Sequence, residues 1–355
     1  MRLGTVLTTL LCLFLVTAAP GQSRRMEDIE IEGTGEAPGL DIETWVKGEE
    51  LTLATGRTHI VFFWSIQSQV SRAAFEPLTE LQETYIDEGL KVIAITNDDV
   101  EQVERFVKRH DGEMGFTVAV DRRSSTQKAW QQLLENRDDI TGLSFVVGNN
   151  GRLQIYGHPL APGYEDYLAR IVSGRFDATL EREALPRLEA ARRARKTKTF
   201  RMAFRHYDDV IELDHKVFAE TALERFEMML VDMQDPEEAY TYAREKLMGE
   251  YFANDAGALG MLAEKIATDP DIPADDRDLD VALEAALAMM QIESDRDPKA
   301  CAKVALVRYH RGELEQAVDL QKRAYFMARP KRKAGYKRVL EAYQEAAERV
   351  ERVGG

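Results

Sequence analysis

The order of apolar and polar residues divides this chain into two parts. Between residues 58 and 172, short apolar runs typical of strands alternate with segments in which apolar residues recur every three or four positions, as on one face of a helix. The expected strands are 58–65, 90–96, 116–120, 143–147 and 152–156. After about residue 177 only the helical period remains. The pattern therefore predicts an α/β domain followed by an all-helical domain.

Helices are expected between these strands and after the last one. The helix expected over 72–88 has an apolar face formed by Ala74, Leu78, Leu81 and Tyr85. The remaining helices are expected over 99–109, 124–134 and 164–172. Asn149–Gly151 has the composition of a hairpin turn, and short edge pieces are expected near Trp45 and Leu51–Leu53. The first domain thus reads as a parallel β–α–β core followed by an antiparallel hairpin and a closing helix.

The N-terminal residues have the features of a secretory signal sequence. Arg2 is followed by an apolar run and then by small residues, so residues 1–21 are expected to form a signal peptide, cleaved after Ala18 or Gly21. The alternative is an uncleaved membrane anchor, although the apolar run is shorter than a bilayer span requires. After cleavage we expect no stable membrane insertion and a periplasmic or extracellular location. Residues 22–36 are polar and are expected to be a loose leader.

The chain is acidic, because its 355 residues carry a formal net charge of −15 at pH 7. This balance argues against nucleic-acid binding, which requires a basic face for the phosphates. Two basic runs, 192–201 and 322–338, interrupt the acidity. Each run is typical of a solvated helix face, or else it contacts an acidic partner or the chain's own acidic surface.

Several fragments of the first domain occur in the order found in one family of proteins. They are Ala37-Pro38, Trp45–Gly48 with Leu51, the run Phe63–Arg72, and Gly151–Pro159. In this order they resemble the exported redoxins of the TlpA and thiol-disulfide interchange type, an AhpC/TSA-like group with the thioredoxin-like fold. The resemblance covers about residues 37–176 and implies an α/β thioredoxin-like sandwich there.

The departures from that family fall on the residues that carry its chemistry. Its two reactive cysteines correspond to Ser68 and Ser71, and its cis-proline corresponds to Gly142. Disulfide exchange requires a thiolate that attacks sulfur and a partner thiol that resolves the mixed disulfide. A serine hydroxyl is far too basic to replace the thiolate, and it cannot bond reversibly to sulfur. We therefore assign no catalytic residue at these positions.

The same positions are candidates for binding. A helix that starts at Ser68–Ser71 would present free N–H groups and the positive end of its dipole to an anion or a peptide. The alternative is that one of the serines only caps the helix. The residues predicted to line such a site are Trp64, Gln67, Ser68, Ser71, Arg72 and Gly142.

One segment of the second domain carries a legible repeat pattern. Its small residues are Ala305, Gly312, Ala317 and Ala324. This spacing resembles the tetratricopeptide repeat (TPR), in which small residues let paired helices approach closely. Earlier helix pairs, near 199–231 and 235–266, keep the helical period without the consensus. The resemblance implies a TPR-like solenoid of three or four hairpins over residues 177–355, and another all-helical stack is the alternative.

The cysteine count limits the chemistry further. Cys12 lies in the predicted signal peptide, so Cys301 is the only cysteine expected in the mature chain, where it reads as a small buried apolar residue. The six histidines show no spacing typical of metal ligands, and His158 in the Gly157–Pro159 turn reads as structural. We therefore predict no metal and no cofactor.

These features favour an exported, redox-inactive protein that acts in protein–protein interaction, holding a protein or peptide partner on its thioredoxin-like groove or its helical surface. The alternative is a thiol-disulfide oxidoreductase or antioxidant of the redoxin family, which would have to use Cys301. A second alternative is a structural protein of the cell envelope.

Overall fold

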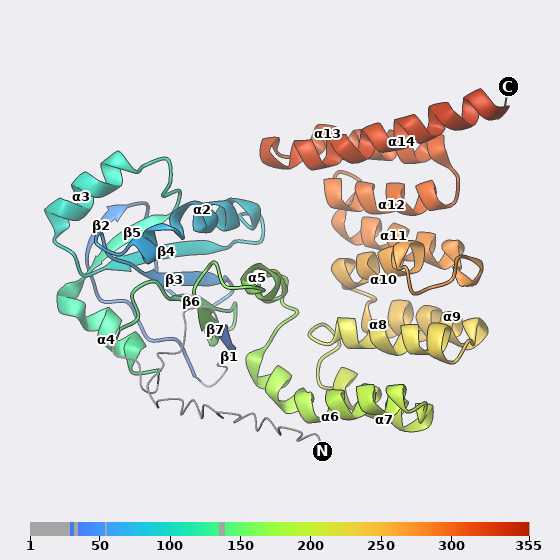
Figure 1. Cartoon of the computed structure of the whole chain (residues 1–355), viewed down its shortest axis with the longest axis horizontal. Coiled ribbons are helices and arrows are strands. Elements are labelled where there is room, and N and C mark those ends of the chain that lie inside the picture. The colour runs from blue at the N-terminus through green and yellow to red at the C-terminus, as the bar shows by residue number, and fades with distance from the viewer. Residues whose placement is uncertain (1–28, 32–34, 54, 135–138, 355) are drawn as a thin grey trace, which may run out of the picture.

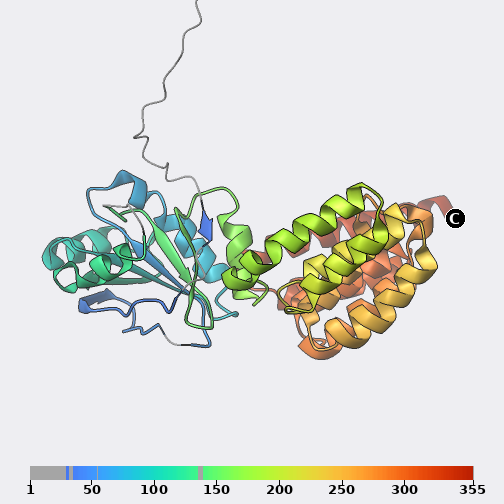
Figure 2. The same cartoon turned by 90° about the horizontal axis from the view of Figure 1, so that it is seen from below.

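The computed structural model describes residues 29–31, 35–53, 55–134 and 139–354, and the predicted signal peptide lies outside these residues. A thioredoxin-like α/β domain is followed by a largely helical part, and the two lie beside each other as separate lobes (Figures 1 and 2). In the described part of the chain, no helix combines the length and the apolar character that a membrane span requires.

A single seven-stranded sheet forms the centre of the first domain. Its strands are β1 Glu30–Ile31, β2 Ile42–Lys47, β3 His59–Phe63, β4 Lys91–Thr96, β5 Thr117–Asp121, β6 Ser144–Val147 and β7 Leu153–Gly157. They lie in the order β1-β7-β6-β3-β4-β5-β2. Strands β3, β4 and β5 are parallel, and β6 and β7 form an antiparallel hairpin against β3. The predicted parallel core and hairpin are therefore confirmed.

The edges of the sheet differ from the prediction. Strand β1 lies within the segment expected to be a loose leader, yet Glu30 pairs with Tyr156 of β7. Leu51–Leu53 forms no strand, whereas the piece around Trp45 belongs to β2 and pairs with β5. Edge strands depend on which neighbour has free backbone groups, and an apolar pattern does not contain that information.

Helices cover both faces of the sheet. They are α1 Gln69–Arg72, α2 Phe75–Thr84, α3 Val100–Arg109, α4 Ser125–Gln131 and α5 Tyr164–Val172. Side chains alternate along β3, so that Ile60 and Phe62 pack with α2, α3 and α5, while Val61 and Phe63 pack with Trp130 of α4. The helix predicted over 72–88 is α2, which follows the short α1, starts three residues later than predicted and ends four residues earlier. There Gly89, with φ of +82°, lets the chain turn so that the Leu90 N–H donates to the Tyr85 carbonyl.

The second part of the chain consists of stacked helices. They are α6 Ala178–Lys196, α7 Phe200–Ile211, α8 Ala219–Glu227, α9 Pro236–Tyr242, α10 Ala256–Thr268, α11 Leu279–Glu293, α12 Pro298–His310, α13 Leu314–Met327 and α14 Lys333–Gly354. Two π-helical segments, Met228–Asp232 and Ala243–Tyr251, continue α8 and α9. One apolar core runs through the stack from Ala191 to Val307. Consecutive helices therefore share a continuous core, as in a solenoid.

The small residues of the legible repeat are packing residues. Ala305, Ala317 and Ala324 are each 0% exposed, and Gly312, with φ of +77°, makes the turn between α12 and α13. A larger side chain at the alanine positions would separate the two helices.

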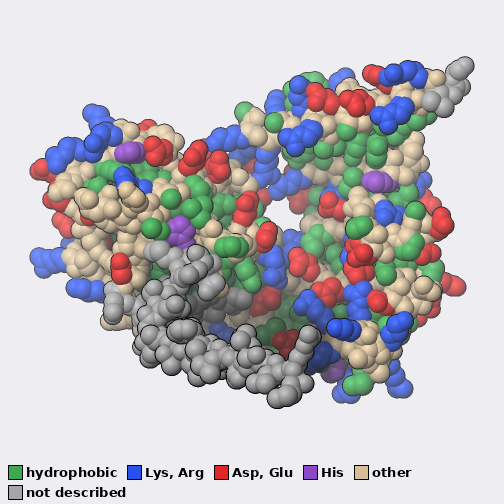
Figure 3. All heavy atoms as spheres, viewed as in Figure 1, with side chains coloured by type: hydrophobic (Ala, Val, Ile, Leu, Met, Phe, Trp, Pro, Cys, Tyr) green, Lys and Arg blue, Asp and Glu red, His purple; other side chains and the backbone are tan. Residues whose placement is uncertain are grey.

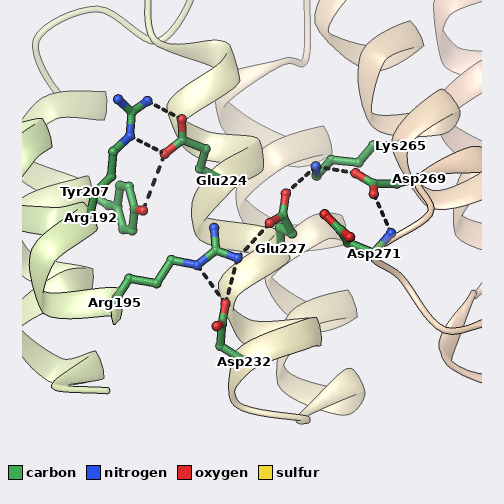
Figure 4. A network of polar contacts seen from close by, with 9 residues as sticks. All are labelled: Arg192, Arg195, Tyr207, Glu224, Glu227, Asp232, Lys265, Asp269 and Asp271. Atoms are coloured by element: carbon green, nitrogen blue, oxygen red, sulfur yellow. Dashed lines mark hydrogen bonds and ion pairs between the residues drawn. The ribbon is translucent and has the colours of Figure 1, made fainter. Parts of the chain in front are cut away.

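A chain of ion pairs ties α6, α8 and α10 together (Figure 4). Arg195 of α6 bonds Glu227 and Asp232, each at 2.7 Å, and Lys265 of α10 bonds Glu227 at 2.5 Å and Asp269 at 2.7 Å. These side chains are between 16 and 30% exposed, so their pairing is only partly screened by water.

The two lobes also meet through charged side chains, where the end of α2 faces α12 and the turn before α14. Glu88 pairs with Lys299 at 2.7 Å, Asp87 pairs with Arg329, and Glu83 pairs with Lys331. We call these six residues the interdomain ion-pair cluster. The hypothesis that the second basic run contacts the chain's own acidic surface is thus confirmed for Arg329 and Lys331. Beside the cluster lies a hollow of about 630 Å³ between the lobes (Figure 3).

Candidate functional site

The turn that precedes α1 lies where the redoxin resemblance places the reactive thiols. The Ser68 side chain caps α1 by accepting from the Ser71 N–H at 3.2 Å. The Ser71 hydroxyl is 0% exposed and donates to the carbonyls of Ser68, at 3.0 Å, or Ser65, at 3.3 Å. Both hydroxyls therefore serve the backbone of the turn, which is the helix-capping alternative.

Asp98 holds the same turn from the end of β4. Its carboxylate accepts from the Ile66 N–H at 2.6 Å, the Ser65 hydroxyl at 3.2 Å and the Thr96 hydroxyl at 3.0 Å. Sequence reasoning missed this residue, because Asn97–Asp99 reads as a helix start and Asp99 alone caps α3. The sequence does contain one indication. A helix start needs a single capping acid, and with Asp99 as the cap of α3 the neighbouring Asp98 has no assigned role.

Two features of the turn disfavour anion binding at this helix start, where an anion or peptide site stays a prediction. Helix α1 has four residues, and the N–H groups of Ile66, Gln67, Ser68 and Ser71 all donate within the turn or to Asp98. The Asp98 carboxylate also places negative charge beside the turn, which repels an anion.

Gly142 lies beside the Ser68 turn, in a second turn that leads into β6. Its φ is +91°, and its N–H donates to the Phe63 carbonyl at 2.7 Å. Proline has φ near −65° and no N–H, so it fits neither feature. No peptide bond is cis among the residues that the structure describes. At the position that corresponds to the family's cis-proline, Gly142 therefore forms a main-chain hydrogen bond to Phe63.

The residues predicted to line a binding site differ in exposure. Trp64 is 2% exposed and packs on Phe75 and Phe106 with ring centroids 5.2 and 5.5 Å apart, so its side chain belongs to the core. Ser71 and Gly142 are also buried, whereas Gln67 and Arg72 are exposed and Ser68 is partly exposed. A binding role for this group stays a prediction, and only Gln67, Ser68 and Arg72 offer side chains to a partner.

His158 connects the turn after β7 to α1. Its Nδ1 accepts from the Leu160 N–H at 3.1 Å, so its Nε2–H donates to the Val70 carbonyl at 3.3 Å. Burial lowers the pKa of His158 below its ordinary value, which favours this neutral form. The ring thus fixes the position of α1.

Cys301 lies on α12, in the other lobe. It is 0% exposed, and its Sγ donates to the Asp295 carbonyl at 3.2 Å. Burial raises the pKa of the Cys301 thiol, so the reactive thiolate is disfavoured. In the parts of the chain that the structure describes, no three His, Cys, Asp or Glu side chains gather as metal ligands.

A groove along α10, α12 and α14 differs from the turn in size and in charge. Its volume is about 860 Å³. Its cationic lining residues are Lys299, Lys303, Lys331, Arg332 and Arg338, and its lining contains no Asp or Glu. We call it the basic groove. Sequence reasoning found part of it as the second basic run but did not connect that run with α10 and α12.

Comparisons with known proteins concern the first lobe. Residues 35–155 match the model of the AhpC/TSA family. A comparison with curated proteins finds no match.

Three solved structures are similar over about two fifths of the chain. A thiol:disulfide interchange protein DsbE from Chlorobium tepidum has 21% identity and a TM-score of 0.32, over 40% of this chain and 96% of that chain. A thioredoxin-family interchange protein from Chlorobium tepidum TLS has 19% identity and a TM-score of 0.33, over 41 and 96% of the two chains. Peroxiredoxin Q from Xanthomonas campestris has 13% identity and a TM-score of 0.31, over 42 and 98%.

The family match and the strand order agree on the same part of the molecule. The match spans the sheet from the bridge at Glu36 to β7, and that sheet has a parallel β3–β4–β5 core beside the β6–β7 hairpin. Residues 35–155 are therefore similar to the AhpC/TSA family of redoxins and have a thioredoxin-like sheet.

Proposed function

We propose that this chain is an exported, redox-inactive protein that binds a polypeptide partner. Its redoxin-type domain serves as a scaffold, and its helical part supplies binding surface. One observation carries the proposal. Both positions of the redoxin thiols hold serine, and both hydroxyls are engaged in the backbone of the turn.

The direct test is turnover by the purified mature chain. Insulin reduction with dithiothreitol and hydrogen peroxide consumption should both proceed at the rate of the buffer alone. A matched variant, Ser68→Ala/Ser71→Ala, should give the same rate. Turnover well above buffer that disappears in this variant would contradict the proposal.

A thiol-disulfide oxidoreductase is the second candidate, because the AhpC/TSA match belongs to a family of redox proteins. It would have to use Cys301, which is buried, hydrogen-bonded and on the other lobe. Cys301→Ser should leave both assays unchanged. A redox activity that is present in the wild type and lost in Cys301→Ser would establish this candidate instead.

Export, and the alternative of a structural envelope protein, are tested by separate experiments. Mass spectrometry of the secreted chain should find an N-terminus directly after Ala18 or Gly21, as the signal sequence predicts. An intact Met1 on a membrane-bound chain would favour the uncleaved anchor. A purely structural envelope protein would show no specific partner whose binding is lost in a surface variant.

A further inference from the structure

We propose that the basic groove binds an extended polypeptide segment in which acidic and apolar residues alternate in short clusters. This inference rests on the proposed binding function and deepens it, because it assigns the site and the chemistry of the partner.

The charge of the groove is the first argument. Its lining has five cations and no acid, although the whole chain carries a net charge of −15. Lys299, Lys303 and Lys331 are paired with carboxylates, Lys303 with Glu264 at 2.6 Å. Arg332 donates to the Thr84 carbonyl, and its charge helps to lower the pKa of the Glu88 carboxyl, whereas Arg338 has no ion pair with any described residue. The charge of Arg338 is thus left for a ligand, and screening over about 8 Å at physiological salt makes the local cations outweigh the distant net charge.

The apolar lining is the second argument. Met261, Leu306, Val339 and the rings of Tyr336 and Tyr343 line the same groove as the cations. Val339 is 39% exposed, and Tyr343 is held by stacking on Tyr309 with ring centroids 4.4 Å apart. An inorganic anion would use the cations alone, whereas a polypeptide with apolar side chains uses both parts of this lining.

The third argument is that the chain already places such a segment at the end of the groove. Residues 83–88 contain three carboxylates and Ile86, which is 48% exposed. Their carboxylates bind Lys331, Arg329 and Lys299, and Ile86 lines a small cavity with Pro330. Lys299 and Lys331 also line the basic groove, so an acidic and apolar segment is the chemistry that this surface demonstrably accepts.

The proposal is tested by fluorescence polarisation on the full mature chain. The probe is a fluorescein-labelled synthetic peptide of alternating Glu-Glu and Leu-Phe pairs. Two further probes replace every Glu by Gln or by Lys. We expect the Glu probe to bind, the Gln probe to bind at least about tenfold more weakly and the Lys probe not to bind, because charge complementarity sets the specificity.

Two protein variants locate the binding. Lys303→Gln/Arg338→Gln should weaken the Glu probe by about tenfold or more, and Val339→Ser should weaken it by a smaller factor. The matched control Lys322→Gln/Arg349→Gln removes two exposed cations outside the groove lining and should leave binding unchanged. Unchanged far-UV circular dichroism shows that each variant is folded.

Three outcomes would overturn the proposal: no binding of the Glu probe, equal losses in the groove and control variants, or equal binding of an oligothymidine, which would indicate a site for any polyanion. None of these binding results bears on thiol or peroxide turnover, which the assays of the proposed function measure separately. Failure of this inference is therefore distinguishable from failure of the proposed function.

Discussion

The turn around Ser68 and the basic groove differ in whether their polar groups already have partners within the chain. In the turn, backbone N–H groups, two serine hydroxyls and the Asp98 carboxylate satisfy one another. In the groove, Arg338 has no carboxylate partner among the described residues, and the lining contains no acid. Unused capacity for hydrogen bonds and charge pairing therefore lies in the groove, away from the segment that the family resemblance singles out.

The segment that carries the family resemblance is therefore not the surface that is best suited to bind a ligand. A satisfied buried network stabilises a conformation and gains little from a ligand, since every new bond must replace an existing one. An uncompensated cation at an apolar surface gains from an acidic partner at once.

The largest effect is expected for Gly142→Pro, which restores the residue type of the family. Proline cannot adopt φ of +91° and removes the N–H that bonds Phe63, so the first domain should lose about 3 kcal/mol or more of unfolding free energy. All three tryptophans, Trp45, Trp64 and Trp130, lie in that domain, so tryptophan fluorescence in urea reports its unfolding selectively.

Two glycine variants separate the causes of that loss. Gly142→Ala keeps the N–H and should cost the backbone strain of about 1–3 kcal/mol, together with any contact that its Cβ makes at this buried position. Gly163→Ala has a similar φ of +79° with nothing within 4 Å of the added Cβ, and it reports that strain alone. If Gly142→Pro were as stable as wild type, the glycine would not be what closes the turn.

The second prediction concerns the ion pairs that position α10, one wall of the groove. Lys265→Met leaves Asp269 with the Asp271 N–H as its donor and Glu227 with Arg195, and it should destabilise the helical part by about 2–3 kcal/mol, less than for a fully buried pair. Lys337→Met, which breaks an exposed pair with Glu341, should stay within about 0.5 kcal/mol. Circular dichroism in urea measures both.

The same network gives a pH dependence with a definite sign. Burial acts to raise the pKa of Glu227, but hydrogen bonds from Lys265 and Arg195 outweigh it, and the pKa falls below the ordinary 4.5. The stabilisation by the ionised Glu227 carboxylate is thus complete above pH 4.5, and it is lost as the pH falls through the lowered pKa of Glu227 in the folded protein. Wild type should lose more stability than Lys265→Met between about pH 6 and pH 3. Parallel losses in both proteins would show that Lys265 is not the cause.

The third prediction tests Asp98. Asp98→Ala leaves the Ile66 N–H and the Ser65 hydroxyl without their acceptor, and should cost about 1.5–2 kcal/mol by tryptophan fluorescence. Asp99→Ala, which removes only the cap of α3, should cost about 1 kcal/mol. An Asp98→Ala effect no larger than that of Asp99→Ala would mean that the turn does not depend on the carboxylate.

How far the sequence predicts this molecule depends on the range of the interaction. Apolar runs such as 90–96 and 143–147 predicted the central strands, because burial on both faces of a sheet leaves a continuous apolar pattern. The bond from Asp98 to Ile66 joins residues 32 positions apart, and nothing local distinguishes Asp98 from the capping Asp99. The groove required residues of three helices to meet, which depends on how the stack curves. The second basic run showed the charge but not the surface that it forms.

The smallest effect on stability is expected at the interdomain ion-pair cluster, whose members are mostly exposed. Arg329→Glu/Lys331→Glu should change the unfolding free energy by less than about 1 kcal/mol, because exposed pairs contribute little. It should nevertheless let the lobes separate, which small-angle X-ray scattering detects as a larger radius of gyration. Wild type in about 1 M salt should resemble the variant, since screening then acts within about 3 Å. Adding Glu83→Lys/Asp87→Lys to the variant restores opposite charges and should restore the compact value. If the radius does not respond to charge reversal, to salt or to the swap, the lobes are held by other contacts and the acidic segment at the groove is not bound by its charge.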